Sequence, residues 1–453
     1  MEAITLFAQI DQSSVSPNGD RESSEWVFDA FVATEWVTQG RLPSEGMEDN
    51  ALDEAYPVAI IAIDGKSASR TFKIRPNMTG TAWYQITVDA GKGLPARVVG
   101  GGEGEGEVSV TDIRRVDGRQ AKRLDALVAM PKGNTPKLEE LKQLFVPVDR
   151  AASVPDAVVV DVGQAALAAL CMPGGGDPLL FVDLGWPTIF NRQGLPACLP
   201  DMTSTSATVL LTHWDWDHWG LALKSIKWAG SPKHCVITWN LAALDRPWVV
   251  PGVGKAWGSV KLSPMHWRFA LALARRGNLY RWPSSTSFMS NQHLMVARVS
   301  GGKAGDRNNN GLVAVVADQS VGLAPRRAIV LPGDANYPNL PFCKPGWTPK
   351  YAFSGLAASH HGGKVTVAKI PPAASPAWLA MSVGMGNRYK HPATQAQRGY
   401  IDKGWTWQVP TSHRCVGTAA AAHAAHGSVL LTTLTERQQW APSVAPCWYQ
   451  PVQ

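Results

Sequence analysis

The first 95 residues consist of short runs in which apolar and polar residues alternate, separated by Gly, Pro and Asn. The runs are WVFDAFVATEWV from Trp26, YPVAIIAIDG from Tyr56, SRTFKIRP from Ser69 and TAWYQITVDAG from Thr81. Alternation with a period of two predicts β-strands. Residues 1–150 are therefore expected to form a β-rich region of unknown role, with the Gly/Glu-rich stretch at 98–108 as a flexible loop or linker.

The pattern changes at Asp156, where apolar runs begin to end in Gly, Asp or His. DAVVVDVG from Asp156, LLFVDLG from Leu179 and SATVLLTH from Ser206 are typical of buried strands that deliver polar residues at their carboxyl ends. Helices are expected over LEELKQLF from Leu138 and HWRFALALARR from His266, and further strands at 312–317, at 328–331 and from Ser428. The mixture predicts an α/β fold, with an αββα sandwich over residues 151–453.

Composition excludes several classes of protein. The chain has 453 residues, of which 45% are hydrophobic and 17% charged, as in globular proteins. The amino terminus lacks the basic and apolar regions of a secretory signal, and no apolar stretch is long enough to span a bilayer. The six cysteines form no CxxC pair, which favours a reducing compartment over a disulfide scaffold. A cytoplasmic protein without membrane contact is expected.

The chemistry concentrates in TVLLTHWDWDHWG, residues 208–220. An apolar strand is followed within six residues by His213, Asp215, Asp217 and His218. Alternating residues of an extended segment project to the same side, so the first three can converge, and His218 can serve the other side of the cluster. Four such side chains are costly to bury without a cation. The segment therefore predicts a metal site, and the alternative is a polar surface loop.

HxDxDH after a strand resembles the motif of the metallo-β-lactamase superfamily, in the variant found in the metallo-β-lactamase-like domain of competence DNA-uptake channel proteins and their stand-alone relatives. Further blocks are similar to that family in order and spacing across residues 156–433: VDVGQAALAAL from Val160, FVDLG from Phe181, NNNGLVAVV from Asn308, LPGDA with Asp334, ASHHGG with His360 and His361, and SVGMGNRYKHP with His391. One departure is Ala166, where relatives carry an acidic residue. Another is the lack of a third histidine ligand for the first metal position, since His234, His266 and His293 have no motif around them. His266, on an apolar helix, is expected to be structural.

The resemblance implies a centre for two divalent metal ions. His213, Asp215 and Asp334 would hold one ion, and Asp217, His218 and either His360 or His361 the other, with Asp334 between them. Asp217 would also orient the attacking water, and His391 could be a ligand, a phosphate contact or a general acid. Four further residues could balance an anionic substrate: Lys364, Asn387, Arg388 and Lys390.

The ligand types bear on the metal and on the reaction. Three carboxylates favour harder ions, so Mn²⁺ or Mg²⁺ rivals Zn²⁺. Two such ions about 4 Å apart generate hydroxide from water at neutral pH and clamp the reacting oxygens.

Charge and aromatic residues suggest the substrate. The formal net charge is +7, yet residues 220–285 contain ten basic residues and one acidic residue, and the remainder has 33 basic against 35 acidic residues. The basic residues are Lys224, Lys227, Lys233, Arg246, Lys255, Lys261, Arg268, Arg275, Arg276 and Arg281. Six tryptophans lie among them in the sequence: Trp228, Trp239, Trp248, Trp257, Trp267 and Trp282. Basic residues attract phosphates and aromatic faces stack on bases, so the segment predicts a nucleic-acid groove. The alternative is that the tryptophans belong to the core and the charges to a solvated face.

The expected function is a two-metal phosphodiesterase, foremost a nuclease acting on DNA or RNA. Two alternatives stay open. One is a hydrolase of a small anionic ester or cyclic nucleotide, and the other is a metal-binding or interaction module that has lost its catalytic capacity. Protein partners are not indicated.

Overall fold

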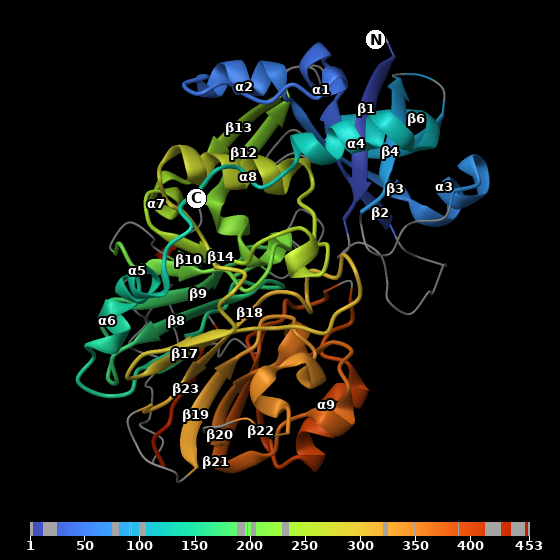
Figure 1. Ribbon diagram of the computed structural model, residues 1–453. Helices are drawn as coiled ribbons and strands as arrows, with labels where there is room; N and C mark the ends of the chain where they lie inside the picture. The colour runs from blue at the N-terminus through green and yellow to red at the C-terminus, as the bar shows by residue number, and fades with distance from the viewer. Residues whose placement is uncertain are drawn as a thin grey trace.

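The computed structural model describes most of the chain, drawn in Figure 1. The described residues are 3–11, 25–74, 81–89, 91, 93–98, 106–187, 195, 196, 198–200, 205–228, 235–319, 325–345, 347, 350–387, 389–412, 427–435 and 449–451. Within them, no helix combines the length and the apolar character needed to cross a bilayer. Of the residues discussed above, Lys233, His234 and Arg388 lie outside the described ranges.

The amino-terminal region is a closed six-stranded barrel with the strand order β1-β2-β3-β5-β6-β4. Its strands are β1 (Ile4–Ile10), β2 (Glu25–Val32), β3 (Val58–Asp64), β4 (Trp83–Asp89), β5 (Leu94–Val98) and β6 (Gly106–Val116). Three of the four alternating runs supply β2, β3 and β4, as their period predicts. The ends of the Gly/Glu-rich stretch belong to β5 and β6, which pair with each other, while residues 99–105 lie outside the described ranges. The stretch is thus a connection within the barrel rather than a linker between domains.

The fourth run, SRTFKIRP, was expected to be a strand, and this prediction is wrong. Its first four residues end helix α3 (Gly65–Phe72). The Asp64 side chain accepts a hydrogen bond from the backbone N–H of Ser67, which caps the helix, and Ala68 packs against the barrel core. A cap and one buried face outweigh an alternating pattern of only a few residues.

The barrel shares a hydrophobic core with the rest of the chain. Phe31 of β2 and Tyr56 pack edge-on against Trp267, with ring centroids 5.6 and 5.3 Å apart. Trp267 lies on α8 (Pro264–Arg275), whose first turn also docks on the barrel, because Asp29 of β2 accepts hydrogen bonds from the Ser263 hydroxyl and the Met265 N–H. The remaining helices of the region are α1 (Glu35–Gln39), α2 (Asp49–Ala55), α4 (Gly118–Leu127), α5 (Leu138–Gln143) and α6 (Val146–Asp149).

The described residues after 150 form two seven-stranded sheets and two short two-stranded ones. The first has the order β15-β14-β11-β9-β8-β7-β23 and the second β16-β17-β18-β19-β20-β21-β22. The first contains β7 (Asp156–Val159), β8 (Leu167–Cys171), β9 (Leu180–Leu184), β11 (Thr208–Leu210), β14 (Trp248–Val250), β15 (Leu279–Arg281) and β23 (Val429–Leu431). The second contains β16 (Phe288–Ser290), β17 (Leu294–Arg298), β18 (Leu312–Val316), β19 (Arg326–Leu331), β20 (Tyr351–Ala357), β21 (Ala373–Met381) and β22 (Trp407–Pro410).

The two sheets face each other across one hydrophobic core. The outer face of each sheet belongs to a further, separate core. Val182 of β9 and Ala314 of β18 belong to the core between the sheets, whereas Phe181 packs toward the barrel and α8, and Val315 toward α9 (Thr394–Asp402). Because neighbours along a strand point to opposite faces, each apolar run serves two cores at once. Figure 1 shows the barrel at one end of the molecule and the second sheet with α9 at the other.

The prediction of an αββα sandwich is wrong. Among the described residues after 150, only α8 and α9 reach eight residues, so each sheet has a single long helix on its outer face and not a layer of helices. The barrel, α8 and the hairpin of β12 (Leu223–Trp228) and β13 (Cys235–Trp239) cover the first sheet instead. The architecture is β-rich, with a closed barrel and several sheets.

The other elements are short. They are α7 (Leu241–Leu244), β10 (Cys198–Pro200), β24 (Tyr449–Pro451), η3 (Trp216–His218), η4 (Gly220–Ala222), η5 (Lys255–Trp257), η6 (Tyr337–Asn339), η7 (Pro341–Cys343), η8 (Ser359–Gly362) and η9 (Val367–Lys369).

Candidate metal centre

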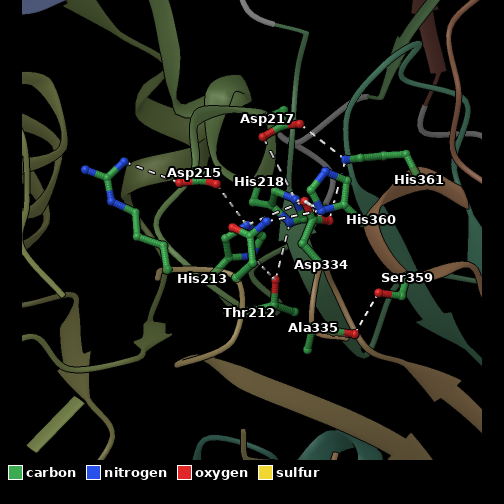
Figure 2. A network of polar contacts seen from close by, with 12 residues as sticks. Thr212, His213, Asp215, Asp217, His218, Asp334, Ala335, Ser359, His360 and His361 are labelled. Carbon is green, nitrogen blue, oxygen red and sulfur yellow. Dashed lines mark hydrogen bonds and ion pairs between the residues drawn. The ribbon is translucent and has the colours of Figure 1, made fainter. Parts of the chain in front are cut away.

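The carboxyl ends of strands from both sheets place the predicted ligands together. β9 runs parallel to β11, and β19, β20 and β21 are parallel to one another. The segment after β11 carries the HxDxDH motif, Asp334 follows β19, and His360 and His361 follow β20. Since the carboxyl ends of parallel strands share an edge, residues more than 100 positions apart converge. Figure 2 shows Asp334 among the histidines of this cluster.

Asp183, at the end of β9, fixes the first part of the motif. Its Oδ1 accepts a hydrogen bond from the backbone N–H of Thr212 at 2.7 Å, and its Oδ2 accepts one from the Thr212 hydroxyl at 2.8 Å. The same Oδ2 lies 2.7 Å from Nδ1 of His218. All three residues are buried. A carboxylate that holds one imidazole nitrogen directs the other, here Nε2 of His218, toward the cluster.

Three histidines share one arrangement of their ring nitrogens. Nδ1 of His218 faces Asp183, Nδ1 of His361 lies 2.8 Å from the carbonyl oxygen of Ser382, and Nδ1 of His213 lies 3.1 Å from the Thr212 hydroxyl. Nε2 of each of the three is buried and makes no hydrogen bond of good geometry, although carboxylate oxygens lie 3.2 Å from Nε2 of His218 and of His361. An orphaned buried nitrogen is costly, and a ring held at Nδ1 with Nε2 exposed to a cluster of carboxylates is the usual form of a metal ligand. These residues therefore fit a bound cation.

Asp334 turns its two oxygens to different partners. Oδ1 lies 3.2 Å from Nε2 of His218 and 3.7 Å from Nε2 of His361, whereas Oδ2 lies 3.9 Å from Nε2 of His213 and 3.5 Å from Nδ1 of His360. Asp217 lies on the Oδ1 side, with its own Oδ2 3.2 Å from Nε2 of His361. A carboxylate placed in this way can bridge two cations.

The two adjacent histidines of the HHGG turn separate because of their backbone. His360 and His361 both have positive φ, 52° and 54°. This conformation is unfavourable for residues other than Gly and persists where surrounding structure enforces it. This backbone conformation turns the His361 side chain inward, where it is 4% exposed, and leaves that of His360 33% exposed. His360 lies beside Asn308, whose amide nitrogen is 3.1 Å from the His360 Nδ1. Of the two histidines considered for the second ion, His361 is the one that faces Asp217 and His218.

Buried carboxylates and imidazoles in the cluster stabilise each other's charged forms. Burial alone would raise the pKa of Asp334, but the imidazoles of His360, His218 and His361 outweigh it and hold that pKa well below its ordinary value. Burial likewise opposes the charged form of His218, yet Asp183 and Asp334 raise its pKa well above the usual range. Asp217 is kept at a lowered pKa, against burial, by His361 and His218. Such perturbed groups gathered in one place are typical of a functional site.

The donor atoms form two overlapping groups. Those of His213, His218 and Asp334 lie within 4.8 Å of one another, as do those of Asp217, His218 and His361. Asp215 belongs to neither group. Its Oδ2 lies 3.5 Å from Nε2 of His213, and its Oδ1 lies 3.3 Å from a guanidinium nitrogen of Arg307. The structure thus gathers all seven predicted ligands, with Asp215 at the edge.

His391 lies beside the HHGG turn. Its ring centroid is 5.5 Å from that of His360 and 6.4 Å from that of His361. Burial, followed by the neighbouring His360 and His361, lowers its pKa to about 3. Its backbone is clasped by Asn387, whose carboxamide accepts from the His391 N–H and donates to the His391 carbonyl. Asn387, expected to contact substrate, is instead committed to its own loop. Lys364 and Lys390 are exposed.

The basic, Trp-rich segment is largely part of the core. Trp248, Trp257, Trp267 and Trp282 are at most 2% exposed, so these four rings cannot stack on bases. Several of the cations are in ion pairs, among them Arg268 with Asp53 at 2.5 Å, Lys261 with Asp125 at 2.7 Å, Arg275 with Asp49 at 2.9 Å and Arg276 with Asp245 at 3.1 Å. Lys224, Lys227 and Lys255 are exposed. The alternative interpretation, core tryptophans beneath a solvated face, describes the buried four.

Sequence reasoning missed residues that hold the ligands in place. Asp183 lies in the FVDLG block and Gln164 in the VDVGQ block, so the blocks were recognised while the roles of these side chains were not. Ser382 likewise begins the SVGMGNRYKHP block, and its backbone carbonyl contacts His361. Arg307, just before NNNGLVAVV, carries no signal in a single sequence, because its partner Asp215 is brought near only by the fold.

Comparison with known proteins adds no relative. No family model matches this chain, and no curated protein matches it. The similarity to the metallo-β-lactamase superfamily therefore rests on the motifs alone.

Proposed function

We propose that this protein is a metal-dependent hydrolase with a two-cation centre that cleaves phosphodiesters. The observation that carries the proposal is the division of Asp334 between two donor sets, next to three histidines whose buried Nε2 atoms make no hydrogen bond of good geometry. The motifs that resemble the metallo-β-lactamase superfamily supply an independent argument for the same residues.

The donor sets follow from the two oxygens of Asp334. His213 and Asp215 would hold one cation with Oδ2, and Asp217, His218 and His361 the other with Oδ1. Two divalent ions held there would lower the pKa of a water and neutralise charge on the reacting oxygens. Three carboxylates in the set favour Mn²⁺ or Mg²⁺ as much as Zn²⁺.

The protein's own residues would orient the attacking water, exclude bulk solvent and attract the substrate. Asp217, 16% exposed at its side chain and 3.2 Å from Nε2 of His361, can accept a hydrogen bond from the attacking water and orient it. Burial of His213, His218 and Asp334 excludes bulk water and strengthens each electrostatic contact. Exposed Lys364 and Lys390, on the loops after HHGG and before His391, supply positive charge for an anionic substrate.

Nucleic acid is the first substrate class that we propose, on the strength of the motif resemblance and the exposed lysines. The burial of Trp248, Trp257, Trp267 and Trp282 favours a second candidate, a small phosphodiester such as a cyclic nucleotide, because it removes four of the aromatic faces that a strand of bases would need.

An assay across metals and substrates tests the proposal. Purified protein is incubated with Mn²⁺, Zn²⁺ or Mg²⁺ and with labelled single-stranded DNA, RNA or bis(p-nitrophenyl) phosphate. Cleavage that is lost in Asp217→Asn and retained in Asp112→Asn, an exposed barrel carboxylate, supports a metal-dependent phosphodiesterase. Cleavage of the small ester alone selects the second candidate. Absence of cleavage by metal-loaded protein would leave a binding module, the remaining alternative.

A further inference from the structure

Gln164 is a buried side chain with both ends of its carboxamide engaged. It follows β7 and is 1% exposed. Its Oε1 accepts a hydrogen bond from the backbone N–H of Gly384 at 3.2 Å, and its Nε2 lies 3.4 Å from Nδ1 of His391. Because a backbone N–H can only donate, Oε1 must face Gly384. This fixes the orientation of the amide, so its NH₂ group faces His391.

The ring of His391 is held against the metal centre from the opposite side. A Cβ built on Gly363, the second Gly of HHGG, would come 2.6 Å from the His391 Nε2, so the ring packs directly on that turn. Asn387 accepts from the His391 N–H at 2.9 Å and donates to its carbonyl at 2.7 Å. The ring can therefore neither withdraw from Gln164 nor rotate freely.

These contacts determine which ring nitrogen carries the proton. The amide NH₂ has only hydrogens to offer, so Nδ1 of His391 must accept, and the proton of the neutral ring then sits on Nε2. The imidazolium form would bring a second N–H against the Gln164 NH₂, two donors face to face. Metal coordination through Nε2 would move the proton to Nδ1 and create the same conflict. His213, His218 and His361 show the opposite pattern, with Nδ1 facing an oxygen.

We propose that Gln164 is a positioning residue that holds His391 as the neutral Nε2–H tautomer, so that His391 is neither a metal ligand nor a general acid but a fixed hydrogen-bond donor to a phosphoryl oxygen. This assignment of the substrate atom rests on the function proposed above. The tautomer itself does not, since it follows from the contacts of Gln164 alone.

Nitrogen NMR tests the tautomer directly and needs no catalytic activity. Protein with ¹⁵N-labelled histidine is loaded with Zn²⁺, and the His391 signals are assigned by their loss in His391→Asn. The expected spectrum at neutral pH shows an unprotonated Nδ1 and a protonated Nε2. In Gln164→Glu, which keeps the acceptor for Gly384 but replaces the amide by a carboxylate, Nδ1 is expected to become protonated.

Two results would overturn the inference: a His391 that is protonated at Nδ1 in the wild-type protein, or a Gln164→Glu variant with an unchanged tautomer. Bound metal is measured in every sample, and equal metal content shows that the variants retain the centre. Gln164→Met, which removes the donor without adding an acceptor, serves as a second variant and is expected to give a mixture of both tautomers. Failure of the phosphodiesterase proposal leaves these spectra unchanged, so the two claims fail separately.

Discussion

Arg307 donates a hydrogen bond to Asp215 at the edge of the candidate metal centre, with Nη1 3.3 Å from Oδ1 and both side chains buried. The guanidinium leaves Oδ2 of Asp215 directed at His213. It is one of the groups, with His213, that hold the pKa of Asp215 below its ordinary value although burial acts to raise it. A carboxylate that we propose as a metal ligand is thereby kept ionised and held in orientation by a residue outside the donor cluster.

Replacing this support should weaken one metal position more than the other. We expect Arg307→Met to lower affinity for one of two ions by about 10- to 100-fold, the usual effect of losing a residue that orients a ligand. Arg307→Lys should lose less, because it keeps the charge. Titration with Co²⁺, followed by absorption, separates the two binding steps, and an equal loss at both steps would contradict the assignment of Asp215 to one ion. Thermal unfolding identifies any variant that fails to fold, since an unpaired buried carboxylate is destabilising.

Asp183 should matter for metal binding without touching the metal. Asp183→Asn puts an amide where His218 and Thr212 now donate, so at least one of these hydrogen bonds is lost and the His218 ring is free to turn. The expected result is a loss of affinity of about 10-fold or more for the ion held by His218. Metal titration of the variant measures it, and wild-type affinity would show that Asp183 serves folding alone.

A methyl group at Gly363 should displace His391 from its present position. The backbone at Gly363 has φ −72°, a value that Ala adopts. The new Cβ would come within 2.6 Å of Nε2 and 2.7 Å of Cε1 of His391, and within 2.8 Å of the backbone carbonyl oxygen of His360. We expect Gly363→Ala to retain its metal and to lose phosphodiesterase activity. Gly91→Ala, at a position with no atom within 4 Å of the added Cβ, is the matched control. Full activity in Gly363→Ala would exclude His391 from a role that depends on its present position.

His266 should make the fold sensitive to acid. It is buried on α8 beside Ser263, as expected of a structural histidine, and burial followed by the charge of Arg307 lowers its pKa from 6.5 to about 4, with Asp29 and Asp215 acting in the opposite direction. A depressed histidine pKa means that the unfolded state binds the proton first. Stability is therefore complete above about pH 6.5 and lost as the pH falls toward 4, by up to about 3 kcal/mol.

Urea unfolding of the wild-type protein and of His266→Gln at pH 7 and pH 4.5 measures this contribution. The variant is expected to be less stable at pH 7 because of lost packing, yet to lose less free energy of unfolding between the two pH values. Parallel losses in both proteins would show that other groups account for the acid sensitivity.

The ligand cluster could be predicted from the sequence because its residues stand at strand ends. TVLLTH, IVLPGD and the run before HHGG are apolar segments followed at once by chemically active side chains, and strands that share a direction bring such ends together. The choice between His360 and His361 could not be made in this way. It depends on two consecutive positive φ angles, which the pattern ASHHGG does not encode.

The sequence pattern alone could not predict what covers the outer faces of the sheets, or which side chains of the basic segment are buried. In α8, Trp267 and Arg268 are neighbours in a segment that was expected to line a groove, yet Trp267 packs on Phe31 and Tyr56, and Arg268 binds the backbone carbonyls of Leu52 and Tyr56. Their partners lie more than 200 residues away in the barrel. Local sequence patterns do not show that these strands close into a barrel. Composition counts charges and rings but does not distinguish a face turned to solvent from one turned to another part of the chain.

The number of metal ions that the protein binds decides between a two-cation centre and none. Wild-type protein and Asp334→Asn are saturated with Mn²⁺ or Zn²⁺, freed of excess ion by gel filtration and analysed by mass spectrometry of the metal. We expect about two equivalents in the wild-type protein and a clear loss in the variant, because Asp334 faces both proposed donor sets. Fewer than about one equivalent in the wild-type protein, or an unchanged content in Asp334→Asn, would contradict this expectation.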